Sequence, residues 1–314
     1  MKPLKIKPTL LILAIAAAAV SASAAFFILQ PQQEGIDKLV IAVQPTQNPV
    51  EIKSRAEQLR LFLEERLDLP VEIYVPTNYA AVVEALRFRN AHLALMGSWP
   101  AYIATSKADS EVILAEVRTV AIDGKVVEET YYFSYWIVLK DSPYQSLQEL
   151  RGRKACFPSP LSSSGYLAPL AKLVELGLVK VEEGKPADPE SFFGEAVFGG
   201  GYGQCWAALK AGQVDVAVIA GDVAYDLYKE AIDNSRVLEK QGPLPSHVVV
   251  AVKDLPEELK QRIKLAFTEL GREEYRDMMK RLVSAIFVGF RESTTEEHLG
   301  SLSKFIEMTG LEFT

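Results

Sequence analysis

Three consecutive serines, Ser162, Ser163 and Ser164, are the side chains in this sequence whose spacing most clearly suggests a chemical role. They follow a short apolar run at 154–157 and precede a segment at 165–176 that has the pattern of a helix. The first backbone N–H groups of a helix have no partner within it, and the helix dipole makes this end partly positive. Additional hydroxyl donors there would complete a site for an oxyanion. Because one serine is enough to cap a helix, the three together favour anion binding over a simple cap.

The segments before the serines have the order of a parallel sheet flanked by helices. Apolar runs at 39–43, 71–75 and 93–96 alternate with helical patterns at 50–67 and 79–88. Short loops between such elements are typical of β-α-β units. A second alternating series begins with the run at 154–157, and helical patterns at 257–271, 273–283 and 294–308 end the chain.

These two series predict an α/β protein with two lobes that act as a clamp. We expect residues 38–139 and 246–314 to form lobe 1 and residues 142–240 to form lobe 2. Two turn-rich crossings, near 139–142 and 241–245, would join them and serve as hinges. Ligands of open α/β sheets bind at the carboxyl ends of strands, so we expect the binding site in the cleft between the lobes.

Composition excludes some classes of partner. The chain has 314 residues and a formal net charge of −7, and the first 30 residues contribute lysines but no acid. A strongly acidic mature chain argues against nucleic acid and against acidic membrane surfaces as partners. An anion would therefore be held by local hydrogen-bond donors.

The N-terminus carries a hydrophobic leader. Residues 9–29 are uncharged and mostly apolar, and they follow a basic start. Ala22-Ser23-Ala24 resembles a signal-peptide cleavage site, whereas the apolar run continues to a length that can span a bilayer. Residues 1–30 are thus either a signal peptide or a membrane anchor. Both alternatives place the rest of the chain outside the cytoplasm.

Cys156 and Cys205 are the only cysteines. In an exported protein they can form a disulfide, and two buried free thiols are the alternative. The three histidines are far apart and lack the spacing of metal ligands. The glycine loop at 199–203 lacks the Gly-Lys-Ser/Thr ending of a P-loop. We therefore expect neither a metal nor a nucleotide cofactor.

Several motifs together resemble the phosphate/phosphite/phosphonate-binding proteins of ABC importers. The segment 78–88 is similar to the family's DYAxxIxAxRF helix start, and 94–98 lies where the family has an IAWYGN-type strand and turn. The segment 160–169 is similar to its DPxSTSGYLxP signature and 211–217 to its xGxVDVA strand. The order and spacing agree over roughly residues 38–270. The resemblance implies a type II periplasmic-binding fold, with a mixed, mainly parallel sheet in each lobe.

The resemblance also implies roles for individual residues. Ser162, Ser163 and Ser164 would donate hydroxyl groups to phosphoryl oxygens, together with the backbone N–H groups of Ser164 and Gly165. Tyr79 matches a tyrosine that donates to the ligand at the start of the family's second helix.

Four positions depart from the relatives that bind aminoalkylphosphonates. Met96 stands where those proteins have a ligand tyrosine, and Tyr202 replaces a histidine. Asp222 replaces a glutamate that contacts the ligand amine, and His247 replaces a second acid. These changes favour phosphate, phosphite or a small alkylphosphonate over 2-aminoethylphosphonate. Asp222 is either a helix cap or an acceptor for a protonated ligand oxygen, and both roles are compatible.

The serines lack the signatures of catalytic nucleophiles. None of the three lies in a Gly-x-Ser-x-Gly motif or begins a Ser-x-x-Lys motif. The sequence therefore predicts a non-enzymatic, extracytoplasmic binding protein that closes around its ligand and delivers it to an ABC permease and ATPase. A ligand-sensing ectodomain for a separate signalling protein is the alternative, and an enzyme on the same fold is a weaker one.

Overall fold

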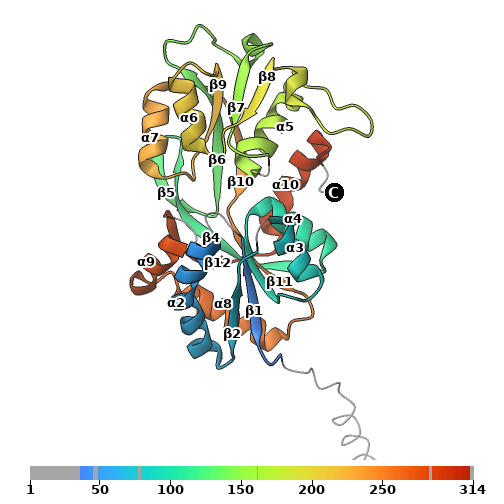
Figure 1. Ribbon diagram of the computed structural model, residues 1–314, viewed down its shortest axis with the longest axis vertical. Helices are drawn as coiled ribbons and strands as arrows, with labels where there is room; N and C mark the ends of the chain where they lie inside the picture. Colours follow the sequence, from blue (N-terminus) through green and yellow to red (C-terminus); the bar gives the residue numbers. More distant parts are fainter. Residues whose placement is uncertain (1–35, 45–48, 77–78, 161, 283–284, 312–314) are drawn as a thin grey trace, which may run out of the picture. The chain divides into compact units, whose positions relative to one another are not determined.

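Two β-sheets, each covered by helices, form the unit from Asp37 to Thr314 (Figure 1). The computed structural model describes residues 36–44, 49–76, 79–160, 162–282 and 285–311. The predicted leader, residues 1–30, lies outside these residues. None of the helices described is long and apolar enough to cross a membrane.

The first sheet has seven strands, and its parallel part agrees with the prediction. Strand β1 lies between β2 and β3 and is parallel to both. All five side chains of β1 are buried, as expected for a central strand covered on both faces. The elements of this part are β1 (Leu39–Val43), α2 (Pro49–Leu67), β2 (Val71–Tyr74), α3 (Tyr79–Arg87), β3 (Leu93–Met96) and α4 (Ser98–Lys107).

Antiparallel strands complete the first sheet, so the expectation of a mainly parallel sheet is wrong for it; the second sheet likewise mixes parallel and antiparallel pairings. Strand β11 lies between β3 and β4, and β12 lies on the other side of β4. The hairpin partner β5 pairs with the end of β4. Strands β5 and β12 are short and were not predicted from the sequence. The elements are β4 (Ser110–Ile122), β5 (Lys125–Glu129), β11 (Val248–Val252), α8 (Glu257–Glu269), α9 (Glu273–Leu282) and β12 (Phe287–Glu292).

The second sheet has the order β10-β6-β9-β7-β8. Alternate residues of its central strands face opposite helices, as strand geometry requires. Trp136 and Val218 pack with α5, whereas Ile137 and Ile219 pack with α6 and α7. The elements are β6 (Tyr131–Leu139), β7 (Lys154–Phe157), α5 (Ala168–Glu175), β8 (Glu195–Phe198), α6 (Tyr202–Lys210), β9 (Val216–Ala220), α7 (Tyr225–Asp233) and β10 (Ser235–Pro245).

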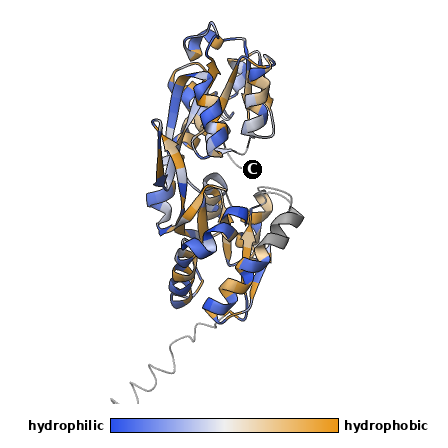
Figure 2. Ribbon diagram, turned by 90° about the vertical axis from the view of Figure 1, so that its left-hand side faces the viewer, coloured by the Kyte–Doolittle hydropathy of each residue, from blue (hydrophilic) through white to orange (hydrophobic). Residues whose placement is uncertain are grey.

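Short helical turns and the last helix complete the fold. Hydrophobic residues are concentrated on the strands, and hydrophilic residues on the outer helices (Figure 2). The last helix packs against α4 as well as against α5 and β10. The remaining elements are the 3₁₀ turn η1 (Leu147–Leu150), the π turn η2 (Ser163–Leu167), the 3₁₀ turn η3 (Pro189–Ser191) and α10 (Thr295–Thr309).

The chain passes between the sheets at different places from those predicted. The crossing expected near 139–142 is wrong, because β6 pairs along its length with β10 and also with β9 in the second sheet. The chain instead enters the second sheet at Thr130 and leaves it between Pro245 and Val248. Tyr131–Leu139 is an interior strand of the second sheet. We expected it in lobe 1, because the sequence does not show which strands it pairs with.

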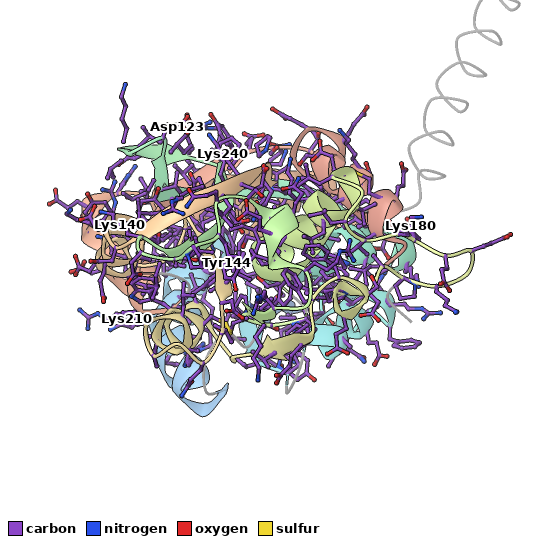
Figure 3. The ribbon with its side chains drawn as sticks, turned by 90° about the horizontal axis from the view of Figure 1, so that it is seen from above. Asp123, Lys140, Tyr144, Lys180, Lys210 and Lys240 are labelled. Carbon is purple, nitrogen blue, oxygen red and sulfur yellow. A yellow bond between two sulfur atoms is a disulfide. The ribbon has the colours of Figure 1, made fainter. Side chains whose placement is uncertain are left out.

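A third connection between the sheets is the end of β4. Val120 and Ala121 pack into hydrophobic clusters of the second sheet, and the Ala121 N–H donates to Gly221 O at 3.0 Å. Lys240 of β10 forms an ion pair at 2.5 Å with Asp123 in the β4–β5 turn, and the two side chains lie close together in Figure 3. The β4–β5 hairpin is thereby attached to the second sheet.

Candidate functional site

A cavity of about 240 Å³ lies where the strand ends of the two sheets meet. Most of its lining residues follow the carboxyl ends of strands, which is where α/β sheets bind ligands. Tyr132 is an exception, because it lies inside β6. The first sheet provides residues after β1 and β3, and the second provides residues after β7, β8 and β9. Polar residues dominate the lining: Gln44, Ser98, Tyr132, Ser159, Ser162, Ser163, Ser164, Tyr202, Asp222 and His247.

The three serines form one wall of this cavity. Ser162 caps the π turn η2, because its Oγ accepts a hydrogen bond from the Gly165 N–H at 2.9 Å. The interpretation of Ser162 as a helix cap is therefore confirmed. The N–H of Gly165 was predicted to donate to the ligand, but here it donates to the Ser162 hydroxyl. Ser163 and Ser164 occupy the first turn, where N–H groups have no partner within the helix. Both residues line the cavity at the partly positive end of the helix.

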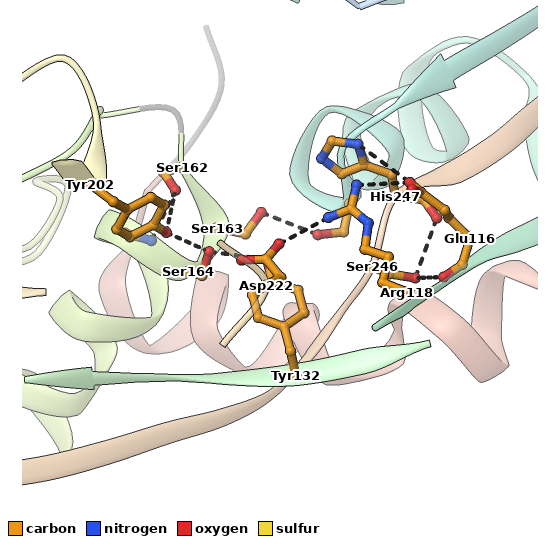
Figure 4. A network of polar contacts seen from close by, with 12 residues as sticks. Glu116, Arg118, Tyr132, Ser162, Ser163, Ser164, Tyr202, Asp222, Ser246 and His247 are labelled. Atoms are coloured by element: carbon orange, nitrogen blue, oxygen red, sulfur yellow. Dashed lines mark hydrogen bonds and ion pairs between the residues drawn. The ribbon is translucent and has the colours of Figure 1, made fainter. Parts of the chain in front are cut away.

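Two tyrosines extend the row of donors. The Tyr202 hydroxyl, in the first turn of α6, lies 2.7 Å from Ser164 Oγ and 3.4 Å from Ser162 Oγ. The Tyr132 hydroxyl donates to Ser164 Oγ at 3.0 Å from the other side (Figure 4). Burial, with a smaller contribution from Asp222, raises the pKa of both tyrosines above the ordinary value. Both hydroxyls therefore stay protonated and remain hydrogen-bond donors.

A disulfide lies behind this wall. Cys156 at the end of β7 and Cys205 in α6 are joined, with their Cα atoms 5.4 Å apart. Gly199 packs directly on the bond, since a Cβ there would lie 2.9 Å from one Sγ and 3.0 Å from the other. The disulfide thus fixes the start of α6, which carries Tyr202, against the strand that leads into the serine loop.

The first sheet provides the opposite wall. Ser98 at the start of α4 places its Oγ 3.2 Å from Ser163 Oγ. Gln44 is buried and accepts the Gly97 N–H through Oε1 at 2.9 Å, which directs its side-chain amide at the cavity edge. Sequence reasoning missed Gln44 and Ser98, although each comes directly after the carboxyl end of a strand.

Asp222 is the only carboxylate among the residues that line the described cavity. It forms an ion pair with Arg118, whose Nη1 lies 2.9 Å from Asp222 Oδ2. Burial raises the pKa of Asp222, and the adjacent Arg118 guanidinium opposes that rise. The ion pair with Arg118 favours the charged form of Asp222, and a carboxylate only accepts hydrogen bonds.

His247 lies between the cavity and the core of the first sheet. Burial, together with the positive charge of Arg118, lowers its pKa well below the ordinary value. The ring is therefore neutral at neutral pH, and the 3.8 Å separation between its Nδ1 and Glu116 Oε2 is not an ion pair. A neutral imidazole offers the ligand one N–H donor and no charge.

Six of the nine residues predicted for the site line the cavity: Ser162, Ser163, Ser164, Tyr202, Asp222 and His247. Met96 does not. It is buried in β3 and lines a much smaller neighbouring cavity, because successive residues of a strand face opposite sides and Gly97 takes the cavity side. Tyr79 begins α3, but its side chain lies outside the described residues.

The arrangement is suited to binding and offers no activated nucleophile. The serine hydroxyls are hydrogen-bonded to tyrosine and serine hydroxyls, which are poor bases at neutral pH. Within the ranges that the structure describes, no group of three or more His, Cys, Asp or Glu side chains is placed to hold a metal ion. The cavity presents many neutral donors and one acceptor carboxylate to a small anion.

Known proteins with similar sequences bind phosphorus compounds according to their names. The model of one family, described as "ABC transporter, phosphonate, periplasmic substrate-binding protein", matches residues 41–298. The phosphate-import protein PhnD of Mycolicibacterium smegmatis is 28% identical over 241 residues, which are 74% of this chain and 72% of that protein. The phosphonates-binding periplasmic protein of Escherichia coli is 25% identical over 292 residues, which are 90% of this chain and 80% of that protein.

A solved structure also shares the fold. PhnD1 from Prochlorococcus marinus, determined in complex with methylphosphonate, has a TM-score of 0.64 and 19% sequence identity. The match covers 86% of this chain and 97% of that chain. The two-sheet architecture of the chain is therefore that of a periplasmic-binding protein, as predicted.

Proposed function

Because the chain belongs to the family of periplasmic substrate-binding proteins of phosphonate ABC transporters, we propose that it captures a small phosphorus oxyanion in the cavity described above. The captured ligand is phosphate, phosphite or a small alkylphosphonate. The protein then delivers it to the permease and ATPase of an ABC importer. It acts outside the cytoplasm, where an oxidising environment suits the Cys156–Cys205 disulfide.

The observation that carries this proposal is the convergence of neutral donors on one small cavity. Hydroxyl groups of Ser162, Ser163, Ser164 and Tyr202 come from the second sheet, and Ser98 comes from the first. Such donors, with the N-terminal N–H groups of a helix, match the several acceptor oxygens of a tetrahedral anion. The relatives named for phosphate and phosphonates support the same ligand class.

Asp222 selects for a protonated oxyanion in this proposal. A carboxylate accepts a hydrogen bond from a P–OH group, whereas it repels a fully ionised tetrahedral anion such as sulfate. Phosphate, phosphite and alkylphosphonates all carry a P–OH group in their singly charged forms. The cavity therefore favours these forms.

Capture requires that the two sheets move relative to one another. The two sheets, each with its helices, bend about Thr130, about the link from Pro245 to Val248, and about β4 where it joins the second sheet. Ligand contacts to both walls favour the closed arrangement, and closure is a ligand-shifted equilibrium. The permease recognises the closed form. The leader at 1–30, as a cleaved signal or as an anchor, directs the chain to this location.

Calorimetry of residues 31–314 tests the proposal. The protein is titrated with phosphate, phosphite, methylphosphonate, 2-aminoethylphosphonate and sulfate. We expect binding to at least one phosphorus oxyanion and weak or undetectable binding of sulfate. The absence of binding to every phosphorus compound in the series would overturn the proposal.

The Asp222→Asn variant tests the role of the carboxylate. The amide keeps the shape of the side chain but can also donate a hydrogen bond, so repulsion of sulfate is removed. We expect the preference for the phosphorus ligand over sulfate to fall at least 10-fold, with most of the change in sulfate affinity. An unchanged preference would show that Asp222 serves only as a structural group.

A further inference from the structure

Behind Asp222 lies a cluster of buried charges that connects both sheets. Glu116 and Arg118 are two residues apart in β4, so they project from the same face of the strand. The guanidinium of Arg118 forms an ion pair with Glu116 Oε2 at 2.8 Å and a second with Asp222 Oδ2 at 2.9 Å (Figure 4). The side chains of Glu116 and Arg118 are 1% and 3% exposed.

This cluster lies at the hinge. Arg118 pairs with β12 on one side and with β5 on the other, and from Val120 onward β4 packs on the second sheet. Three residues beyond Arg118, the N–H of Ala121 donates to Gly221, the residue before Asp222. Asp222 is therefore attached to β4 by a backbone hydrogen bond and by the guanidinium at the same time.

Stability alone does not account for these charges. Burying an ion pair costs several kcal/mol per ion in desolvation, and replacing it with apolar residues is often neutral or stabilising. Within the described residues, Glu116 Oε1 and Arg118 Nε are buried without a hydrogen-bond partner, so the cluster is incompletely satisfied. A polar cluster of this kind, adjacent to a ligand cavity, suggests a role in recognition.

We propose that Arg118, held by Glu116, determines which oxyanions the cavity accepts, by fixing Asp222 at the hinge side of the cavity as a group that only accepts hydrogen bonds. The proposal rests on the proposed function and adds two residues that do not line the cavity themselves. The accepted ligands are tetrahedral anions with at least one protonated oxygen. Fully deprotonated tetrahedral anions are rejected.

The reasoning follows from what Asp222 would do without its partner. A carboxyl group in a buried site takes up a proton when no cation is present, because burial disfavours the charged form. A protonated Asp222 would donate a hydrogen bond and would no longer repel sulfate. Arg118 prevents this through the ion pair, and Glu116 keeps the planar guanidinium oriented between the two carboxylates.

The double variant Glu116→Gln with Arg118→Met tests the proposal. It removes one negative and one positive charge, so the net charge of the cluster is conserved while Asp222 loses its partner. The protein is produced from the full-length gene, and calorimetry gives the ratio of the sulfate dissociation constant to that of the phosphorus oxyanion, among phosphate, phosphite and methylphosphonate, that the unaltered protein binds most tightly. We expect this ratio to fall at least 10-fold relative to the unaltered protein.

A comparison with Asp222→Asn separates this positioning role from a general loss of structure. If Arg118 acts through Asp222, the triple variant of Glu116, Arg118 and Asp222 has the same ratio as Asp222→Asn alone. Independent effects would multiply instead. A folded double variant with an unchanged ratio, or a triple variant whose ratio falls by the product of the separate effects, overturns the proposal.

Two further variants complete the experiment. As a control, Lys260→Met with Glu111→Gln removes a partly buried ion pair of 2.6 Å elsewhere in the first sheet. The ratio of the two dissociation constants should not change in this variant. Arg118→Lys keeps the charge but cannot bridge two carboxylates with a planar fork. In Arg118→Lys we expect the ratio of the two dissociation constants to fall at least 3-fold. If the double variant does not fold, an unchanged ratio in Arg118→Lys overturns the proposal. If the unaltered protein binds no phosphorus oxyanion, the proposed function itself fails.

Discussion

Removal of the Cys156–Cys205 disulfide should destabilise the fold and should also weaken ligand binding. The bond joins residues 49 positions apart, β7 on one side and α6 on the other. In the chain-entropy account, a cross-link that closes a loop of this size contributes about 4 kcal/mol to the free energy of unfolding. Typical total stabilities are about 5–15 kcal/mol, so the Cys156→Ala, Cys205→Ala variant should remain folded but with a much smaller margin.

The loss of affinity follows from where the bond lies. Gly199 packs on both sulfur atoms, and Tyr202 begins the helix that carries Cys205. Without the disulfide, the start of α6 is held by packing alone, and the Tyr202 hydroxyl has to be ordered when ligand binds. We expect a 3- to 10-fold weaker affinity, which corresponds to about 0.7–1.4 kcal/mol.

Urea denaturation and calorimetry measure the two effects. Both are performed on the unaltered protein, with and without a reducing agent, and on the variant with the same reducing agent as a control. A destabilisation below about 1 kcal/mol would contradict the constraint derived from the loop length. Loss of stability with unchanged affinity would contradict the argument that the bond positions Tyr202.

Two further predictions concern a hydroxyl group and the histidines. Tyr202→Phe removes the hydrogen bonds to the serines, and each is worth about 0.5–1.5 kcal/mol. The ligand affinity measured by calorimetry should therefore fall about 10-fold. An unchanged affinity would exclude this hydroxyl from the site. Burial lowers the pKa of His92, His247 and His298, so the unfolded chain binds protons more readily than the folded one. The free energy of unfolding should therefore decrease as the pH falls below about 6.5, by up to about 1.4 kcal/mol per pH unit for each histidine. Denaturation at pH 7 and pH 5.5 checks this, and His298→Asn should reduce the slope, whereas a flat profile would contradict the lowered pKa values.

The parts of the site that sequence predicted are those set by local chain geometry. Ser162, Ser163 and Ser164 were found because a strand followed by a helix places them at a helix N-terminus whatever the tertiary structure. Asp222 lies just after β9, and Tyr202 lies after the glycine loop that follows β8. The family resemblance indicated their relation to the ligand. The order of strands and helices along the chain was enough to locate these residues, because ligands of such sheets bind at strand ends.

The parts that were missed depend on contacts between distant segments. Tyr132, Glu116 and Arg118 lie inside strands, where a polar residue is usually taken to face solvent. The signal was present in β4, because Glu116 and Arg118 lie two residues apart in the middle of a mostly apolar strand and therefore share one face of it. Only the pairing of β4 with its neighbours shows that this face is buried beside the cavity.

The errors have the same origin. Met96 was assigned to the ligand from its position in the motif, but strand alternation turns it into the core. The strand Tyr131–Leu139 was assigned to the first lobe because it follows β4 in the chain, whereas its partners, β9 and β10, come about 80–110 residues later. Chain order therefore predicted the elements well and the hinge poorly.

A crystal structure of the protein with bound methylphosphonate tests the central claim most directly. We expect the phosphonate oxygens within hydrogen-bond distance of the hydroxyls and N–H groups of Ser163 and Ser164, with Tyr202 beside them. We also expect one oxygen within about 2.5–2.7 Å of an Asp222 carboxylate oxygen, the length of a hydrogen bond from a protonated oxygen to a carboxylate. A ligand bound elsewhere, or one whose oxygens all avoid Asp222, would contradict the account.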